Sequence, residues 1–208
     1  MSKPIYQVFV MNNNIASNLA WKAMSEAERK ALSDQDQASR DAVGAKIILG
    51  CNSAWADESH PFWGVIRFPD LQARIEHTRT IQKIGWLDIV DAFTLLGTSD
   101  SDPAEVTVPN PIYKLWIVKN NPATALTGQL PKGLDALMWE KHNALYEENK
   151  SQVILTCSTS WCNEAYLAFG VSAYPSVEAN MKIMEGLNDL GWPGHMEVIT
   201  YLGIPVTE

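Results

Sequence analysis

The side chains best suited to chemistry in this sequence are a few histidines and acids set among apolar residues. His77 falls beside the apolar stripe of a predicted helix over 70–84, where an imidazole could shuttle protons or bind a metal or haem. Asp91 falls in a predicted strand over 89–96, and a carboxylate on such a face needs a partner or a raised pKa. Both are candidate general bases. A histidine at the helix edge and a solvent-facing or salt-bridged acid are the alternatives.

Three further residues extend this candidate catalytic set. Arg67, within a predicted strand over 62–68, could neutralise a substrate carboxylate or enolate, or could be an edge arginine with a buried stem. Glu197 stands at the position of Asp91 in a second copy of the pattern, and His195, two residues earlier, points to the same strand face. His195 and Glu197 could therefore pair, unless both are exposed at the end of the strand.

A second set of candidates would bind a ligand rather than transform it. The indole rings could line an aromatic pocket, and two of the polar side chains can donate protons; core packing and loop geometry are the alternatives. The set consists of Trp55, Glu58, His60, Trp63, Trp161, Glu164 and Tyr166.

An internal repeat must position all of these residues. Residues 46–97, moved forward by 106 positions, match residues 152–203 without a gap at 14 of 52 positions, where ordinary residue usage would give roughly three by chance. The chain is therefore a duplicated domain. The identical pairs include Cys51/Cys157, Trp55/Trp161, Glu58/Glu164, Gly64/Gly170, Gly85/Gly191 and Trp86/Trp192.

Each copy predicts the element order βαββαβ. In the first copy, apolar runs at 5–11, 46–55, 62–68 and 89–96 predict strands, and helices are predicted over 25–43 and 70–84. Ser25 and Glu28 form a capping box at the first helix, and Gly85 can cap the second.

The second copy repeats this order. Its strands are predicted at 112–118, 152–161, 168–174 and 196–202, and its helices from about 131 and over 176–190. We therefore predict ferredoxin-like repeats at 1–98 and 111–208, joined by a polar linker at 99–110. Each four-stranded sheet would have one face without helices, and two copies in one chain could cover these faces.

This duplicated α+β pattern resembles the dimeric α+β barrel superfamily, with two ferredoxin-like units fused into a pseudo-dimer. The resemblance rests on element order and duplication. It implies a ligand site between sheet and helices. It also implies one of several functions: cofactor-free monooxygenase, lactone isomerase, polyketide cyclase, haem-degrading oxygenase, chlorite-dismutase-like haem enzyme or small stress protein.

Composition limits the remaining classes of function. The net charge of −8 makes nucleic acids and anionic membranes poor partners. Short apolar runs and three cysteines lead us to expect a cytoplasmic protein without a membrane span, either a monomeric pseudo-dimer or a homodimer. The sequence contains no glycine-rich phosphate loop, H-E-x-x-H, C-x-x-C or G-x-S-x-G motif, and its four histidines lack metal spacing.

Three functions remain open from the sequence. The first is a cofactor-independent enzyme that oxygenates, cyclises or isomerises a small apolar or aromatic metabolite, with His77 or Asp91 as base and Arg67 as oxyanion stabiliser. The second is a haem protein with His77 or His195 as axial ligand. The third is a non-catalytic binding or stress protein.

Overall fold

The structure, a computed structural model, describes residues 3–120, 134–192 and 196–206. The chain forms two compact units. One contains the chain up to Ser99 together with Val206, and the other spans Asp100–Pro205. Within the described residues, no helix is both long and apolar enough to cross a membrane.

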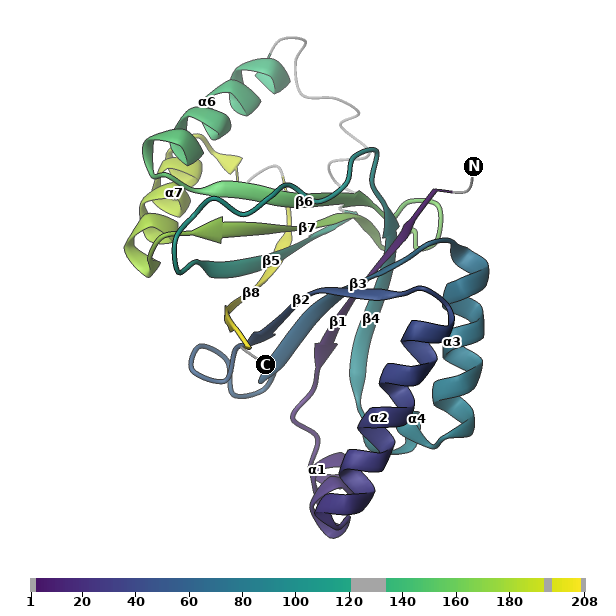
Figure 1. Cartoon of the computed structure of the whole chain (residues 1–208). Coiled ribbons are helices and arrows are strands. Elements are labelled where there is room, and N and C mark those ends of the chain that lie inside the picture. Colours follow the sequence, from purple (N-terminus) through teal and green to yellow (C-terminus); the bar gives the residue numbers. More distant parts are fainter. Residues whose placement is uncertain (1–2, 121–133, 193–195, 207–208) are drawn as a thin grey trace. The chain divides into compact units, whose positions relative to one another are not determined.

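The first unit is a four-stranded antiparallel sheet with helices on one face (Figure 1). Its strands lie in the order β2, β3, β1, β4. Its elements are β1 (Ile5–Met11), α1 (Ile15–Ala23), α2 (Glu26–Ala42), β2 (Lys46–Asn52), β3 (Phe62–Phe68), α3 (Leu71–Lys83), α4 (Trp86–Ile89) and β4 (Ala92–Thr98).

The second unit repeats this arrangement, with strands in the order β6, β7, β5, β8. Its elements are β5 (Ile112–Lys119), α6 (Leu134–Glu148), β6 (Gln152–Ser158), β7 (Tyr166–Tyr174), α7 (Val177–Asp189) and β8 (Val198–Pro205). Figure 1 shows α6 and α7 together on one face of this sheet. The predicted tandem ferredoxin-like fold is therefore confirmed.

Local signals in the sequence account for the main helix boundaries. Ser25 accepts from the Glu28 amide, while the Glu28 carboxylate accepts from the Ser25 amide, so the predicted capping box begins α2. Gly44, Gly85 and Gly191 follow α2, α3 and α7 with φ of 69°, 76° and 74°, a left-handed backbone that glycine adopts without steric cost.

Two short helices were not predicted, and one of them changes the position of a candidate residue. Asn14 caps α1, where the sequence was interpreted only as a turn after β1. The helix α4 occupies Trp86–Ile89, so β4 begins at Ala92 rather than at 89. The predicted start of this strand was therefore wrong, and Asp91 lies in the connection before β4.

Strand alternation divides each sheet into a helix-facing side and a helix-free side. On β1, Ile5 and Phe9 belong to the apolar cluster that includes Ala73 of α3, so Gln7 between them also faces the helices. The helix-free side carries a set of buried apolar side chains. They include Val8, Val10, Trp63 and Val65 in the first unit, and Leu115, Ile117, Phe169 and Val171 in the second.

The repeated glycine pair Gly64 and Gly170 has a packing role. A Cβ on Gly64 would lie 2.7 Å from the Phe9 ring and 2.7 Å from the Leu49 carbonyl oxygen. A Cβ on Gly170 would lie 2.2 Å from the ring of Trp116, which stands at the position equivalent to Phe9. Each glycine therefore leaves the space that an aromatic ring on the neighbouring strand fills.

The predicted linker makes ordered contacts with the second unit. The Ala104 amide donates to the Ile154 carbonyl at 2.8 Å, and the Gln152 side chain donates to the Glu105 carbonyl at 2.7 Å. The Thr107 amide donates in turn to the Gln152 side chain. This segment therefore lies along β6.

Candidate functional site

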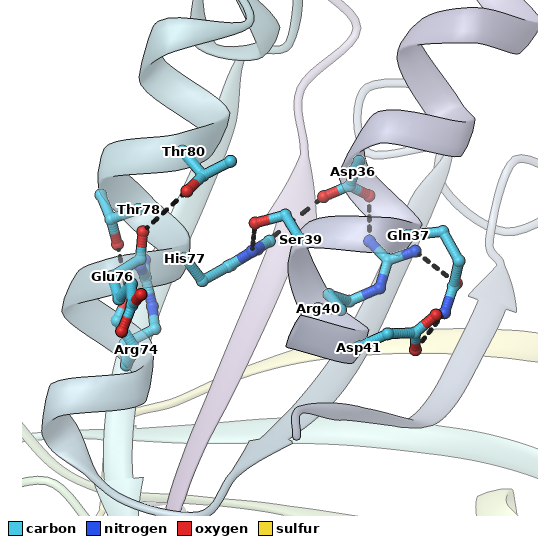
Figure 2. Close-up of polar contacts among 10 residues, drawn as sticks. All are labelled: Asp36, Gln37, Ser39, Arg40, Asp41, Arg74, Glu76, His77, Thr78 and Thr80. Carbon is cyan, nitrogen blue, oxygen red and sulfur yellow. Dashed lines mark hydrogen bonds and ion pairs between the residues drawn. The ribbon is translucent and has the colours of Figure 1, made fainter. Parts of the chain in front are cut away.

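The candidate site in the first unit lies between α2 and α3, where His77 meets two residues of α2 (Figure 2). The His77 Nδ1 lies 2.9 Å from the Ser39 hydroxyl oxygen, and its Nε2 lies 3.8 Å from an Asp36 carboxylate oxygen. Asp36 and Ser39 are three residues apart on α2 and therefore share one helix face. His77 is only 3% exposed, so this group is shielded from water.

The surroundings of His77 keep its imidazole neutral. Burial lowers the pKa of His77 to about 4; Asp36 opposes this shift, while the positive charges of Arg74 and Arg40 add to it. Asp36 is itself paired with Arg40, one turn further along α2, which compensates the buried carboxylate (Figure 2). The imidazole can therefore accept a proton at neutral pH.

The hydrogen-bond chemistry of the three side chains favours one arrangement of protons. Asp36 is too far from the His77 Nε2 for a hydrogen bond, but its negative charge favours a hydrogen on the Nε2 that faces it. The His77 Nδ1 then accepts from the Ser39 hydroxyl. In this arrangement His77 is positioned to take a proton from Ser39 while Asp36 stabilises the resulting imidazolium.

Several buried polar atoms of the first unit have no hydrogen-bond partner among the described residues. They include Oε1 of Gln7, on the helix-facing side of β1, and Nε of Arg74, on α3. Gln7 is only 7% exposed, and the guanidinium of Arg74 lies over the Phe68 ring at 5.6 Å. A buried polar atom without a partner costs free energy, so these two groups could hold a polar ligand or an ordered water.

Arg67 does not join His77 in one site. Arg67 alternates with Ile66 and Phe68 on β3, and Phe68 packs against His77 on the helix-facing side, so Arg67 points to the other face. The structure therefore does not bring His77 and Arg67 together in one site. Trp63 lies on the same side as Arg67 and is fully buried.

The two aligned acids, Asp91 and Glu197, each form contacts that fix the connection before the last strand of their unit. The Asp91 carboxylate accepts from the side-chain amides of Asn12 and Asn14 at 2.9 and 2.8 Å, and these bonds lower its pKa. The exposed Glu197 pairs with Lys119, whose backbone amide donates to the Glu197 carbonyl. Each acid thus ties the segment before the last strand to the end of the first strand.

The repeated loop residues also share a structural arrangement. The side chains of Asn13 and Asn120, at equivalent positions, each donate at 3.0 Å to a backbone carbonyl, that of Glu58 and Glu164 respectively. The carboxylates of Glu58 and Glu164 are exposed. The contact that the two loops share is therefore made by the backbone of Glu58 and Glu164, without their carboxylates.

The remaining loop candidates lie at the surface of their units. Trp55 and Trp161 are 48% and 44% exposed. His60 is half-buried and contacts Asp57 through Nδ1 at 2.8 Å, and its equivalent Tyr166 accepts at its carbonyl from Thr159. His195 lies outside the described residues.

The second unit contains a buried polar cluster that the sequence analysis missed. Lys114 of β5 faces the helices and is only 6% exposed. Its ammonium donates to the Asn180 side-chain oxygen at 3.2 Å and lies 2.9 Å from the Met184 sulfur, both on α7. No carboxylate among the described residues forms an ion pair with Lys114, and burial lowers its pKa to about 8.

Aromatic and hydroxyl groups lie on the same side of the sheet as this lysine. Ser172, directly across the strand pair from Lys114, accepts from the Trp116 indole at 3.2 Å and lies 3.2 Å from the Tyr146 hydroxyl. The hydroxyls of Tyr146 and Tyr174 are 2.7 Å apart. Two hydrogen-bonded groups are therefore neighbours through the strand pair of Lys114 and Ser172. Together they are called the Lys114 cluster, which consists of Lys114, Trp116, Tyr146, Ser172, Tyr174, Asn180 and Met184.

His142 of α6 lies beside the Lys114 cluster. Its ring stacks on Tyr146 and on Trp192, with centroids 4.5 and 5.4 Å away. Its Nδ1 lies 3.2 Å from the Asn143 side-chain oxygen, and burial lowers its pKa. Nε2 has no hydrogen bond within the described part of the chain.

The missed residues had a signal in the sequence. Lys114 stands in the middle of the apolar run IYKLWIV. The first strands of the two copies align at an offset of 107, one more than the rest of the repeat, which sets Lys114 against Gln7 in IYQVFVM. The offset of 106 pairs Asn180 with Arg74. Each of these two positions, in an otherwise apolar surrounding, thus carries a polar residue in both copies. This recurrence identifies the positions even though the residue types differ.

A shallow surface hollow also occurs on the first unit, lined by residues from Trp21 to Ser33 of α1 and α2. It holds none of the polar groups described above and lies on the outer side of the helices. We assign no chemistry to it.

No protein-family model matches the sequence, and no curated protein matches it. The fold resembles solved structures over nearly the whole chain. Chlorite dismutase from Candidatus Nitrospira defluvii in complex with imidazole superposes with a TM-score of 0.74 at 9% identity, covering 98% of this chain and 91% of that one. A haem-binding protein from Thermus thermophilus gives a TM-score of 0.68 at 9% identity, with coverage of 99% and 92%.

A candidate monooxygenase from Lactobacillus acidophilus also superposes, with a TM-score of 0.55 at 12% identity and coverage of 99% and 95%. The protein therefore has the fold of the dimeric α+β barrel superfamily. The solved structures that share this fold include chlorite dismutases, a haem-binding protein and a candidate monooxygenase. At these identities the likeness concerns the fold alone.

Proposed function

We propose that the protein is a cofactor-independent enzyme of the monooxygenase, cyclase or isomerase type, acting on a small apolar or aromatic molecule. The observation that carries the proposal is the neutral, buried imidazole of His77 in contact with both Ser39 and Asp36. Because the ring is unprotonated at neutral pH, it has a lone pair that could accept a proton, and the Asp36 charge would favour the protonated ring. The unpartnered groups of Gln7 and Arg74 in the same unit support a polar substrate group nearby.

Each residue of this site has a distinct role in the proposal. His77 receives the proton through the Ser39 hydroxyl, and Asp36 offsets the positive charge that then forms on the ring. The Arg74 guanidinium, whose Nε has no hydrogen-bond partner among the described residues, stabilises the negative charge left on the substrate. This role replaces the one assigned to Arg67 from the sequence.

Oxygen uptake and substrate loss would test this proposal with a panel of polycyclic phenols and wild-type protein. His77→Gln is expected to lower turnover about a hundredfold, because general-base catalysis contributes about that much or more. His60→Gln, a loop substitution at another histidine, is the control and should retain activity. Turnover that survives in His77→Gln would contradict the proposal.

Haem binding is the second candidate function, favoured by the haem-binding proteins among the structural neighbours. His77 does not fit an axial ligand, because both its ring nitrogens face side chains of α2. His142 fits better. Asn143 can orient Nδ1, and Nε2 has no hydrogen bond among the described residues, as second-shell orientation of a ligating imidazole requires.

Haem, when bound, would supply one-electron and oxygen chemistry, and His142 is the described residue that would hold it. Titration with haemin, followed by visible absorption, separates this candidate from the first. A Soret band that is lost in His142→Ala and retained in His77→Gln supports a haem protein. No band in the wild-type protein, purified or titrated, removes this candidate.

A further inference from the structure

The Lys114 cluster in the second unit has a chemical feature that the proposed function does not use. Lysine is rarely buried without a partner of opposite charge, because an uncompensated charge in an apolar layer is costly. Lys114 nevertheless extends from β5 into the layer beneath α7, where only an amide oxygen and a thioether meet its ammonium among the described residues.

The ammonium also has unused hydrogen-bonding capacity. A lysine ammonium has three donors, and the contacts of Lys114 among the described residues are Asn180 and the sulfur of Met184. A thioether is a weak acceptor on a flexible side chain, so Met184 can move aside for a stronger acceptor. A carboxylate oxygen at that place would satisfy both the charge and the free donor.

The other side chains of the cluster indicate what the carboxylate would be attached to. The Ser172 hydroxyl, across the strand pair from Lys114, contacts the Tyr146 hydroxyl and the Trp116 indole, and the Tyr174 hydroxyl contacts that of Tyr146, so three aromatic side chains belong to the cluster. Aromatic side chains favour offset or edge contacts with an aromatic ligand. The cluster therefore offers a ligand apolar contacts from its aromatic rings and hydrogen bonds from its hydroxyl groups.

The internal repeat gives independent support. In the first unit, the positions of Lys114 and Asn180 are occupied by Gln7 and Arg74, whose Oε1 and Nε have no hydrogen-bond partner among the described residues. Each unit thus places one cation and one carboxamide at the same two positions. The cation is on the helix in the first unit and on the strand in the second.

We propose that the Lys114 cluster is a binding site for a small aromatic carboxylate, with the ammonium of Lys114 paired to the carboxylate and the rings of Tyr146, Tyr174 and Trp116 around the ligand. This site lies in the second unit and does not depend on the chemistry proposed for His77 in the first. Its ligand could be a substrate, a product or an effector.

Isothermal titration of the full chain with benzoate tests the site, with benzyl alcohol as a probe of similar shape without the charge. Wild-type protein should bind benzoate, and Lys114→Met should weaken that binding about tenfold or more, because a charge-assisted hydrogen bond is lost. Lys119→Met, which removes an exposed lysine from the same strand, is the matched control and should bind as the wild type does. Benzyl alcohol should bind weakly and equally to all three.

A second measurement does not rely on any variant. NMR of protein carrying 13C-labelled lysine follows the titration of the buried ammonium directly, and benzoate should raise its pKa, because a bound anion favours the charged form. No binding of benzoate to the wild type, equal binding to Lys114→Met, or a Lys114 pKa that benzoate leaves unchanged would each overturn the proposal.

Discussion

At the scale of single residues, the two units differ in how the charge of a buried titratable group is compensated. In the first unit His77 is accompanied by a carboxylate that is paired with Arg40, so charges and hydrogen bonds are largely compensated. In the second unit Lys114 has no such compensation among the described residues. This difference leads to two predictions about stability and pH.

The first prediction concerns acid sensitivity. Because the pKa of His77 is about 4 in the folded chain and 6.5 in the unfolded one, the unfolded state binds more protons between these pH values. The stabilisation is complete above pH 6.5 and is lost as the pH falls toward 4, at a cost of about 2–3 kcal/mol. Urea denaturation at pH 7 and pH 4.5 should therefore show a smaller loss of stability for His77→Gln than for the wild type.

Other groups titrate over the same range, so only the difference between the two proteins is informative. Burial also lowers the pKa of His142, but that contribution is present in both. An identical loss in His77→Gln and in the wild type would show that His77 is protonated without penalty in the folded protein.

The second prediction concerns Lys114. Its pKa of about 8 lies below the unfolded value of 10.5, so stability should rise with pH between these two values. Below pH 8 the full cost of the buried charge applies, and Lys114→Met should be more stable than the wild type by about 2 kcal/mol at pH 7. Tyr146, Tyr174 and His142 face the same layer. Burial raises the tyrosine pKa values and lowers that of His142, so none of them supplies a negative charge near neutral pH.

Denaturation of both proteins at pH 7 and pH 9.5 measures this effect. The advantage of Lys114→Met should shrink at the higher pH, where the wild-type lysine is neutral in the folded state. Equal stability at pH 7 would mean that the ammonium has a compensating partner. If Lys114→Met is more stable than the wild type and no longer binds benzoate, the wild-type lysine lowers stability and is kept for ligand binding.

At the scale of secondary-structure elements, the repeated glycines Gly170 and Gly191 serve different purposes. A Cβ at Gly170 meets the Trp116 ring and, at 2.4 Å, the Leu155 carbonyl of the backbone, which cannot rotate away. Gly191 has nothing within 4 Å, but its φ of 74° disfavours other residues. Gly170→Ala should therefore cost about 1–3 kcal/mol or more, and Gly191→Ala about 1 kcal/mol.

Urea denaturation of the two variants and the wild type measures these costs. Gly170→Ala should also change the near-ultraviolet circular dichroism, because the Trp116 ring must shift. A larger cost for Gly191→Ala than for Gly170→Ala would contradict the packing role assigned to the repeated glycine.

The sequence predicted elements better than sites, and strand alternation explains why. Period-two patterns and caps located the sheets and main helices, but they do not specify the side of a strand on which a ligand binds. Arg67 and His77 were combined because both are polar residues in apolar surroundings, yet Arg67 is one position from Phe68, which marks the opposite face. Asp91 was placed in a strand because the single turn of α4 is too short to give a helical pattern.

The other site residues were missed because the residues that they contact are distant in the sequence. Ser39 and Asp36 carry no distinctive motif on α2, and they become significant only because α3 brings His77 to them. Lys114 was detectable in principle, because the repeat sets it against Gln7 inside an apolar strand. Comparing the two copies for polar residues at apolar positions would have found it.

At the scale of the whole molecule, the feature that bears on the duplication is the helix-free face of the sheet in each unit. In the first unit this face carries Val8, Val10, Trp63, Val65 and Leu95, all buried in the full chain. One face of such a sheet is covered by helices and the other is not. A sheet of this kind standing alone would present a continuous apolar surface to water.

Residues 1–99 expressed alone should therefore self-associate, because apolar burial on one face is worth about 25 cal/mol per Å². Sedimentation velocity over a range of concentrations measures the association, and circular dichroism shows whether the segment is folded. The same segment with Val8→Lys places a charge in the centre of that face and should associate less, because a buried unpaired charge is costly. If the unmodified segment is folded and stays monomeric at high concentration, its helix-free face does not need a cover, which would contradict this prediction.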